Sequence, residues 1–425
     1  MAFNHPSRNT TPSQAIISSL LILPQQSPQC RAGGTFATVL HRPLAERTTL
    51  LIALWGILIV LMAWLALTEL PAGWDGHYPW PFLIALTPFL WIGFAVVGVV
   101  GLCVHEWAFA GCAAVALVAS LLRKTSYYLT DLKAPNTAAA LARHLQERKQ
   151  DAAQPPARDL SRLDDAHDGR FRVMTLNCRF GNADAAEIVT MVREQDIAVL
   201  ALQECSPELI ERLDANGLKE LLPYRQLGDP QPNDNGGFNG VWLRVEPNQS
   251  TPTGCPIPAA DVPTVTLPLS STRDIVFASA HPKSPQRSCR EWSRGIIGLR
   301  ALATADADDE HERIAVVMGD LNSSIPHPSF RKLLAGGFHD AALDEAAGQH
   351  TTFPSWLPWP RIVLDHVLFT DHLRASQVRS VKVTGSDHLA LLATLTIERR
   401  SEPANPAARE SWPESLPPIR RKERA

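Results

Sequence analysis

The sequence lacks the cysteine patterns of a structural zinc site. Its seven cysteines include no Cys-x-x-Cys pair and no cluster with histidine, and tetrahedral zinc sites need such spacings. An excess of one charge is also missing, because the formal net charge is only −3 over 425 residues. We therefore expect no global electrostatic attraction to nucleic acid or to acidic membranes.

The first segment, residues 1–47, lacks the charged start of a signal peptide. It is rich in Ser, Pro, Gln and Thr, and its one apolar run, residues 15–23, is too short to span a bilayer. We expect a disordered tail here, with a start codon assigned too far upstream as the alternative. Residues 398–425 are rich in proline and charge, and we expect a second disordered tail there.

Residues 48–122, in contrast, are almost free of charge. Residues 48–68 are uncharged over 21 positions, the length that a helix needs to cross about 30 Å of hydrocarbon. Two more apolar runs follow, residues 82–102 and 107–122, with His105 and Glu106 between them. We predict three transmembrane helices that anchor the chain in the lipid bilayer. A helical hairpin buried in a soluble protein is the alternative.

The flanking basic residues do not decide the orientation of these helices, since each end has three. They are Arg31, Arg42 and Arg47 before the first span and Arg123, Lys124 and Lys133 after the third. The loop at residues 70–80 has no Lys or Arg, which favours the outer side of the membrane. We therefore expect a multi-pass cell-membrane protein with an extracytoplasmic domain, joined by a linker over residues 123–169.

Residues 170–397 alternate apolar runs of strand length with segments of helical periodicity, which predicts an α/β domain. The predicted strands cover residues 172–176, 197–202, 240–245, 264–267, 275–280, 314–318, 365–369 and 390–396. The predicted helices cover residues 183–195, 207–216, 293–305 and 328–335.

Several of the predicted strands end in polar side chains. The clearest is residues 314–322 (IAVVMGDLN), where Asp320 and Asn322 lie two apart and so point the same way in extended backbone. A turn or helix cap is the alternative interpretation for that pair alone. Five other segments also deliver polar side chains. They are residues 173–179 (VMTLNCR), 198–204 (AVLALQE), 278–282 (ASAHP), 364–366 (LDH) and 383–389 (VTGSDHL).

This ordered set resembles the endonuclease/exonuclease/phosphatase superfamily, the fold of pancreatic deoxyribonuclease, over about residues 170–397. The resemblance implies a four-layer sandwich of two packed β-sheets flanked by helices. It also implies a divalent ion, Mg²⁺ or Mn²⁺, at Asn177, Glu204 and Asp387. A carboxylate at a strand end suits such an ion, although Glu204 could instead serve the helix that starts after Ser206.

The resemblance assigns further roles by position. Asp320 and Asn322 match the pair that orients the attacking water and binds phosphate, and Asp365 matches the carboxylate that sets the tautomer of His388. His281 matches a second histidine on the other side of the phosphate. Arg179 is expected to contact phosphate, and Asn239 is the one substitute for a missing Tyr or Glu. His366 alternates to the opposite face of its strand and is expected to be structural.

The expected function is a membrane-anchored, metal-dependent hydrolase of phosphate esters, most simply a phosphodiesterase. A non-catalytic membrane-tethered binding or scaffold protein is the alternative, and no protein partner is predicted. The substrate class stays open between nucleic acid, phospholipid headgroup and small phosphate ester. The domain has an excess of acidic residues, whereas residues 283–300 hold five basic residues and one acidic one. Trp356 and Trp359 could stack on a base, touch lipid or pack under their loop.

The cysteines of the domain divide into two predicted groups. Cys255 and Cys289 lie in Pro-rich loops, where an oxidising compartment would favour a disulfide between them. Cys178 and Cys205 each stand beside a predicted metal ligand and are expected to be buried thiols.

Overall fold

The computed structural model describes residues 44–128, 169–231, 236–304 and 312–398. The tails predicted at residues 1–47 and 398–425 lie almost wholly outside these ranges, as does most of the linker predicted at residues 123–169. Three helical stretches, Arg47–Glu69, Trp80–Cys103 and Trp107–Tyr127, are long and apolar enough to cross a membrane. They correspond to the three predicted spans, and the third is longer than expected.

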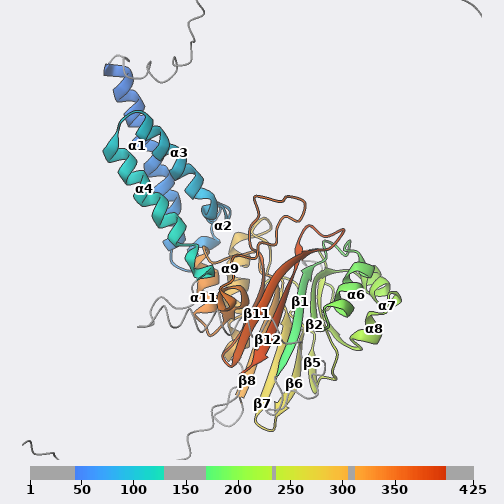
Figure 1. Cartoon of the computed structure of the whole chain (residues 1–425). Coiled ribbons are helices and arrows are strands. Elements are labelled where there is room, and N and C mark those ends of the chain that lie inside the picture. Colours follow the sequence, from blue (N-terminus) through green and yellow to red (C-terminus); the bar gives the residue numbers. More distant parts are fainter. Residues whose placement is uncertain (1–43, 129–168, 232–235, 305–311, 399–425) are drawn as a thin grey trace, which may run out of the picture. The chain divides into compact units, whose positions relative to one another are not determined.

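The apolar region consists of several helical elements, of which α3 and α4 run side by side (Figure 1). The elements are α1 (Leu44–Ala66), η1 (Leu67–Glu69), η2 (Trp74–Gly76), α2 (Trp80–Ala85), η3 (Thr87–Phe89), α3 (Leu90–Cys103), α4 (Trp107–Leu122) and η4 (Thr125–Tyr127).

The domain is built on two six-stranded sheets. The first has the order β11-β12-β1-β2-β4-β3, and the second has the order β5-β6-β7-β8-β10-β9 (Figure 1). The strands of the first sheet are β1 (Arg170–Asn177), β2 (Ile197–Cys205), β3 (Tyr224–Leu227), β4 (Phe238–Leu243), β11 (Leu373–Lys382) and β12 (Leu389–Ile397). Those of the second are β5 (Gln249–Thr251), β6 (Thr264–Ser270), β7 (Arg273–Ser279), β8 (Glu312–Asp320), β9 (His339–Asp340) and β10 (Asp365–Phe369).

The helices of the domain are α6 (Ala185–Glu194), α7 (Pro207–Ala215), α8 (Leu218–Leu221), α9 (Cys289–Gly298), α10 (Ala301–Thr304), α11 (Pro328–Leu334) and α12 (Ala341–Glu345). Their starts follow from the sequence. Asp184, Ser206 and Ser288 each accept a hydrogen bond from the backbone N–H three residues ahead, which satisfies a donor that the first helical turn leaves unpaired.

Three apolar clusters define the layers. One lies between the sheets and includes Phe171 of β1 and Phe277 of β7, whose rings meet edge to face. A second joins the outer face of the first sheet to α6 and α7, and a third joins the second sheet to α9 and α11. Because β2 is covered on both faces, all nine of its residues are buried. The predicted four-layer sandwich is confirmed.

The local predictions differ from the structure in several places, and strands β3, β5, β9 and β11 and helices α8 and α12 were not predicted. The helix expected at residues 293–305 begins earlier, at Cys289, and is divided into α9 and α10 after Gly298. Strand β11 was not predicted, because its polar sequence follows no strict alternation. A bulge between Ser376 and Arg379 interrupts its pairing with β12, and a bulge shifts the two-residue period of a strand.

The segment between α1 and α2 is not a free connector. The buried carboxylate of Asp75 accepts hydrogen bonds from the backbone N–H and the hydroxyl of Ser329 on α11, at 2.8 and 2.6 Å. His327 Nε2 lies 3.0 Å from the carbonyl oxygen of Pro81. Beyond α4, Tyr127 is buried in the cluster between the sheets. The helical region and the domain therefore share buried contacts.

The predicted Cys255–Cys289 disulfide does not form. Both thiols are free, and each contacts a different backbone carbonyl, Cys255 that of Gly298 and Cys289 that of Pro285. Cys178 and Cys205 are free and buried, as expected.

Candidate active site

The first group of site residues comes from the carboxyl ends of β1 and β2. These strands run parallel, and Asn177 pairs in register with Gln203. A bulge in the pairing of β2 with β4 lies between Leu202 and Cys205, and Glu204 within it has a positive φ of 52°. The bulge lets Glu204 reach the site. Asn177 Nδ2 donates to Glu204 Oε1 at 3.0 Å.

The second group comes from the other sheet, where β8 ends beside the start of β10. Asp320 pairs in register with Asp365 in this antiparallel ladder. The approach of β7 to β8 requires glycine at residue 319, since a Cβ there would lie 1.9 Å from the carbonyl oxygen of Ala280. Asn322 has a φ of 49° and donates its backbone N–H to Asp320 Oδ1 at 2.8 Å.

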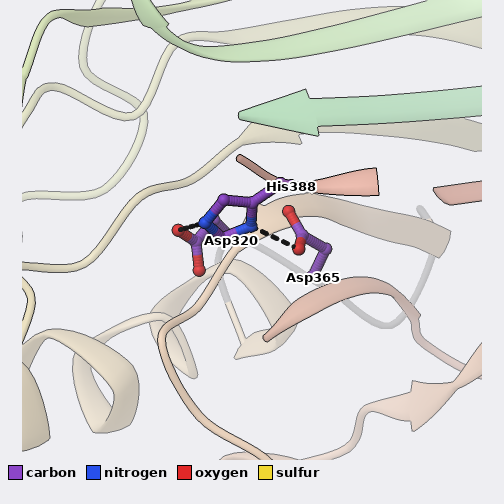
Figure 2. A group of neighbouring side chains, drawn as sticks. All are labelled: Asp320, Asp365 and His388. Atoms are coloured by element: carbon purple, nitrogen blue, oxygen red, sulfur yellow. Dashed lines mark hydrogen bonds and ion pairs between the residues drawn. The ribbon is translucent and has the colours of Figure 1, made fainter. Parts of the chain in front are cut away.

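His388 joins these two carboxylates. Its Nδ1 lies 2.8 Å from Asp365 Oδ2, and its Nε2 lies 3.6 Å from Asp320 Oδ2. Figure 2 shows the imidazole ring between the two aspartates, with one nitrogen turned toward each. The loop before β12 places His388 here, because β12 runs antiparallel to β1 and begins beside the end of β1. The predicted pairing of Asp365 with His388 therefore agrees with the geometry.

Asp320 is the point where the groups meet. Besides His388, its Oδ2 atom lies 3.0 Å from Asn177 Nδ2 and 3.4 Å from His281 Nε2. His281 Nε2 also lies 3.9 Å from Glu204 Oε1. Asn177, His281, Asp320, Asp365 and His388 are all buried. Six of the ten predicted site residues thus surround one small polar region between the ends of the two sheets.

Electrostatics in this region favour charged side chains despite burial. Burial alone would lower the pKa of His388, but the negative charges of Asp365 and Asp320 outweigh it and raise the pKa to about 10. Burial would also lower the pKa of His281, whose hydrogen bond to Asp320 raises it overall. Conversely, burial would raise the pKa of Asp320, but the two histidines hold it well below its usual range.

Two sets of residues could hold a cation. Asp320, Asp365 and His388 lie close enough together to share one. However, a protonated His388 with both nitrogens facing carboxylates offers no lone pair to a metal. Glu204 and Asn177 form the second set. Glu204 offers carboxylate oxygens, which fit Mg²⁺ or Mn²⁺, whereas Asn177 turns its Nδ2 toward Glu204 and Asp320 and its Oδ1 accepts the backbone N–H of Arg179. Gly236 leaves room beside this set, since a Cβ there would lie 2.7 Å from Glu204 Oε2.

The other four predicted residues have looser links to this region. Asp387 forms an ion pair of 3.9 Å with Arg179, and both side chains are partly exposed. Asn322 turns its side-chain Nδ2 toward the carbonyl oxygen of Pro282, at 3.4 Å. Asn239 donates one N–H of its amide to the carbonyl oxygen of Asp261, at 2.8 Å.

Three residues that were not predicted hold the site in place. Ser386 donates its hydroxyl to the carbonyl oxygen of Asn177 and accepts the backbone N–H of His388. The hydroxyl of Thr352 accepts the backbone N–H of Asp365, and the ring of Phe353 lies 4.9 Å from that of His388. Ser386 stands in the VTGSDHL segment and could have been inferred from it. The sequence has no comparable signal for Thr352 and Phe353.

Comparison with known proteins gives a family match. Residues 174–388, about half of the chain, match the model of the Endonuclease/Exonuclease/phosphatase family. No curated protein matches the sequence.

Three solved structures illustrate the similarity to known folds. A humanized D. rerio TDP2 has 15% identity and a TM-score of 0.44, with 53% of this chain and 98% of that chain covered. A mannosyl-6-phosphatase of Bacteroides thetaiotaomicron has 15% identity and a TM-score of 0.41, with 53% and 99% covered. Sphingomyelinase C of Streptomyces griseocarneus has 17% identity and a TM-score of 0.40, with 53% and 99% covered.

Proposed function

The chain belongs to the endonuclease/exonuclease/phosphatase family, and we propose that it is a membrane-anchored, divalent-metal-dependent phosphodiesterase. One observation carries this proposal. A single buried oxygen, Asp320 Oδ2, has side-chain nitrogens of Asn177, His281 and His388 within 3.6 Å. A buried carboxylate flanked by two imidazoles and an amide suits phosphoryl transfer to water, in which negative charge must be stabilised while protons move.

The proposed reaction is the attack of water on phosphorus. The water oxygen bonds to phosphorus, the bond from phosphorus to the leaving oxygen breaks, and one proton moves at each end. Asp320 is ionised, so it accepts a hydrogen bond from the attacking water and then its proton. His281 gives a proton to the leaving oxygen. Loss of that proton also makes Asp320 more basic, because a neighbouring positive charge disappears.

His388 has a different role in this scheme. Asp365 keeps it protonated and oriented, so it donates a hydrogen bond to a phosphoryl oxygen as charge develops there. Arg179 and Asn322 bind the phosphate at the rim of the site. Glu204, Asn177 and Asp387 would hold a divalent ion, which would further polarise the phosphoryl group. After release of product, the proton returns from Asp320 to His281, whose Nε2 lies 3.4 Å from its carboxylate.

The test uses the full chain in detergent and bis-p-nitrophenyl phosphate as substrate. We expect release of p-nitrophenol with Mg²⁺ or Mn²⁺ and its loss in EDTA. Glu204→Gln should lower the rate by roughly two orders of magnitude or more. Glu208→Gln, an exposed carboxylate four residues further along the chain, is the matched control. Equal rates with and without EDTA, or near-normal activity of Glu204→Gln, would refute the metal role.

The membrane arrangement is part of the proposal. The three apolar helices cross the bilayer an odd number of times, so the two ends of the chain lie on opposite sides, with the domain outside the cytoplasm. A protease added to intact cells should then cleave the domain. Its protection in intact cells, followed by cleavage after lysis, would place the domain and its substrate in the cytoplasm.

A further inference from the structure

The exposed large apolar side chains of the domain are gathered at one place. Within the described residues from 169 onward they are Phe180, Trp356, Leu357 and Trp359, with 59%, 60%, 38% and 60% of each residue exposed. All four flank the candidate site. Phe180 donates its backbone N–H to Glu204 Oε2, and the other three lie in the loop that follows Phe353. Exposed apolar groups gathered beside a candidate site usually mark a binding surface.

This loop, residues 353–362, which we name the rim loop, is fixed to the site. Phe353 contacts the ring of His388, and its ring lies 5.8 Å from that of Trp356. Ser355 donates its backbone N–H to the carbonyl oxygen of Asp387 and its hydroxyl to that of Ser386, both at 2.8 Å. A β-bridge between Phe353 and Ile362 joins the two ends of the rim loop. The exposed aromatic rings are therefore held in a defined position beside the site.

The rim loop also contacts the apolar helical region. The rings of Trp359 and Phe89 meet edge to face with centroids 5.9 Å apart. Phe89 lies within Trp80–Cys103, the second stretch long enough to cross a membrane. The exposed surface of the rim loop is thus continuous with a segment that would lie in lipid. Aromatic side chains at such a boundary suit the headgroup level of a bilayer.

Charge near the apolar helical region has the sign that a lipid surface would favour. Helix α9 carries Arg290 and Arg294, both exposed. The chain before α2 lies against this helix, because a Cβ on Gly76 would come within 2.8 Å of Ser293 Cβ. Exposed arginines close to a membrane segment attract anionic headgroups. In addition, Leu357 offers no flat ring for stacking on a base, which favours lipid over single-stranded nucleic acid.

We propose that the rim loop and Phe180 contact the bilayer surface, and that the site hydrolyses phosphodiesters of phospholipid headgroups presented there. This inference rests on the proposed function and adds the substrate class to it. The membrane helices and the rim loop hold the site at the level where headgroup phosphates lie. Attack of water at phosphorus then separates a phosphomonoester from an alcohol, one of which stays in the bilayer.

The experiment compares the same headgroup in two physical states. Full-length protein is assayed with vesicles of phosphatidylcholine and phosphatidylglycerol, with monomeric dihexanoyl forms of both lipids, with bis-p-nitrophenyl phosphate and with a single-stranded oligonucleotide. The variant carries Leu357→Asp and Trp359→Asp, which place charge on the apolar rim. We expect the ratio of the vesicle rate to the bis-p-nitrophenyl phosphate rate to fall at least tenfold.

Two controls separate the rim from general effects. Leu357→Met with Trp359→Phe keeps the surface apolar and should restore the ratio. Gln249→Asp with Ser250→Asp adds the same charge on the exposed edge strand β5 and should leave the ratio unchanged.

Each remaining outcome has one meaning. A wild-type protein that cleaves bis-p-nitrophenyl phosphate but not vesicle lipid overturns this inference alone, as does a vesicle ratio that the rim substitutions do not change. A selective loss of oligonucleotide cleavage would show instead that the rim binds bases. Equal cleavage of monomeric and vesicle lipid would show that the headgroup is recognised without the membrane. Absence of all hydrolysis would refute the proposed function itself.

Discussion

Strand β10 carries two neighbouring residues, Asp365 and His366, that form the same kind of pair on opposite faces. Asp365 meets His388 at 2.8 Å in the candidate site. His366 meets Asp340 at 2.5 Å on the other side of the strand. All four side chains are buried, and both histidines have raised pKa values because, although burial opposes it, the paired carboxylates stabilise the imidazolium.

The two pairs differ in what the second ring nitrogen meets. In His366, Nε2 lies 2.9 Å from the carbonyl oxygen of Ser323, so both nitrogens face acceptors and both must carry hydrogen. In His388, Nε2 faces the Asp320 carboxylate at 3.6 Å, beyond hydrogen-bond distance. One imidazolium is fully satisfied, whereas the other keeps a donor for a further partner. This second contact, and not the ion pair itself, is where the two histidines differ.

The largest expected effect is on the rate of hydrolysis, and it comes from substituting His388, whose Nε2 N–H is available to a further partner. His388→Gln should lower hydrolysis of bis-p-nitrophenyl phosphate by roughly a thousandfold, since one preorganised hydrogen-bond donor to developing negative charge contributes about 10² to 10³ in rate. His366→Gln, the matched substitution on the other face, should lower the rate of the folded enzyme by less than about threefold. Similar losses in both variants would remove the distinction between the pairs.

For the stability of the folded protein we expect the pair of His366 with Asp340 to matter. Asp340→Ala leaves the buried imidazolium of His366 without its partner and removes the cap that the same carboxylate gives to α12. We expect unfolding to require about 3 kcal/mol less free energy, measured by chemical denaturation in detergent. The control is Asp229→Ala, at an exposed residue in the loop after β3. A loss below about 1 kcal/mol would mean that His366 is neutral in the folded protein.

A smaller effect is expected in the pH dependence of the unfolding free energy, which reports the charge of His366. The folded-state pKa of His366 is raised above its ordinary value of 6.5. Its contribution to stability is therefore complete below about pH 6.5 and is lost as the pH rises through the folded-state pKa. The difference in unfolding free energy between wild type and His366→Gln, measured in EDTA, should shrink as the pH is raised from about 6. A difference that grows with pH would show that burial dominates.

The smallest effect is expected at a residue that only positions the site. Ser386→Ala removes the hydroxyl between the carbonyl oxygen of Asn177 and the backbone N–H of His388. We expect about 1 kcal/mol less stability and a several-fold lower turnover number with little change in KM. Ser386→Thr keeps the hydroxyl and should recover most of the rate. Full activity in Ser386→Ala would show that Asp365 alone orients His388.

Strand-end positions were predictable because local patterns determine them. A buried strand that stops at a polar side chain is recognisable in the local sequence, and the residues found in this way are Asn177, Glu204 and Asp320. Asp365 instead begins its strand. The face of each side chain follows from alternation, which is how His366 was separated from Asp365. The sequence did not indicate the direction of the Glu204 side chain, since a bulge after Leu202 alters the alternation of faces at the end of β2.

Contacts between distant segments were not predictable from such patterns. Asp75 and Ser329 are separated by 254 positions, and nothing in either local sequence indicates the other. The contact of the loop at residues 70–80 with α11 was therefore not predicted, although the Asp75 carboxylate is buried there. Phe353 on the ring of His388 and Trp359 on Phe89 are similar cases. The packing of distant segments selects these pairs, and the sequence alone does not indicate which partner an aromatic residue in a Pro-rich loop will contact.

The pairing of β1 with β12 has a consequence for biosynthesis. The first strand of the domain lies between β2 and the last strand, with Arg170 opposite Thr396. While the chain is being made, β1 has only one of its two neighbours until nearly the whole domain has left the ribosome. Its other edge is an open template for wrong pairing during that interval. A nascent chain of this kind depends on protection until its end is synthesised, and a stop codon shortly before residue 389 should yield a product that proteases remove.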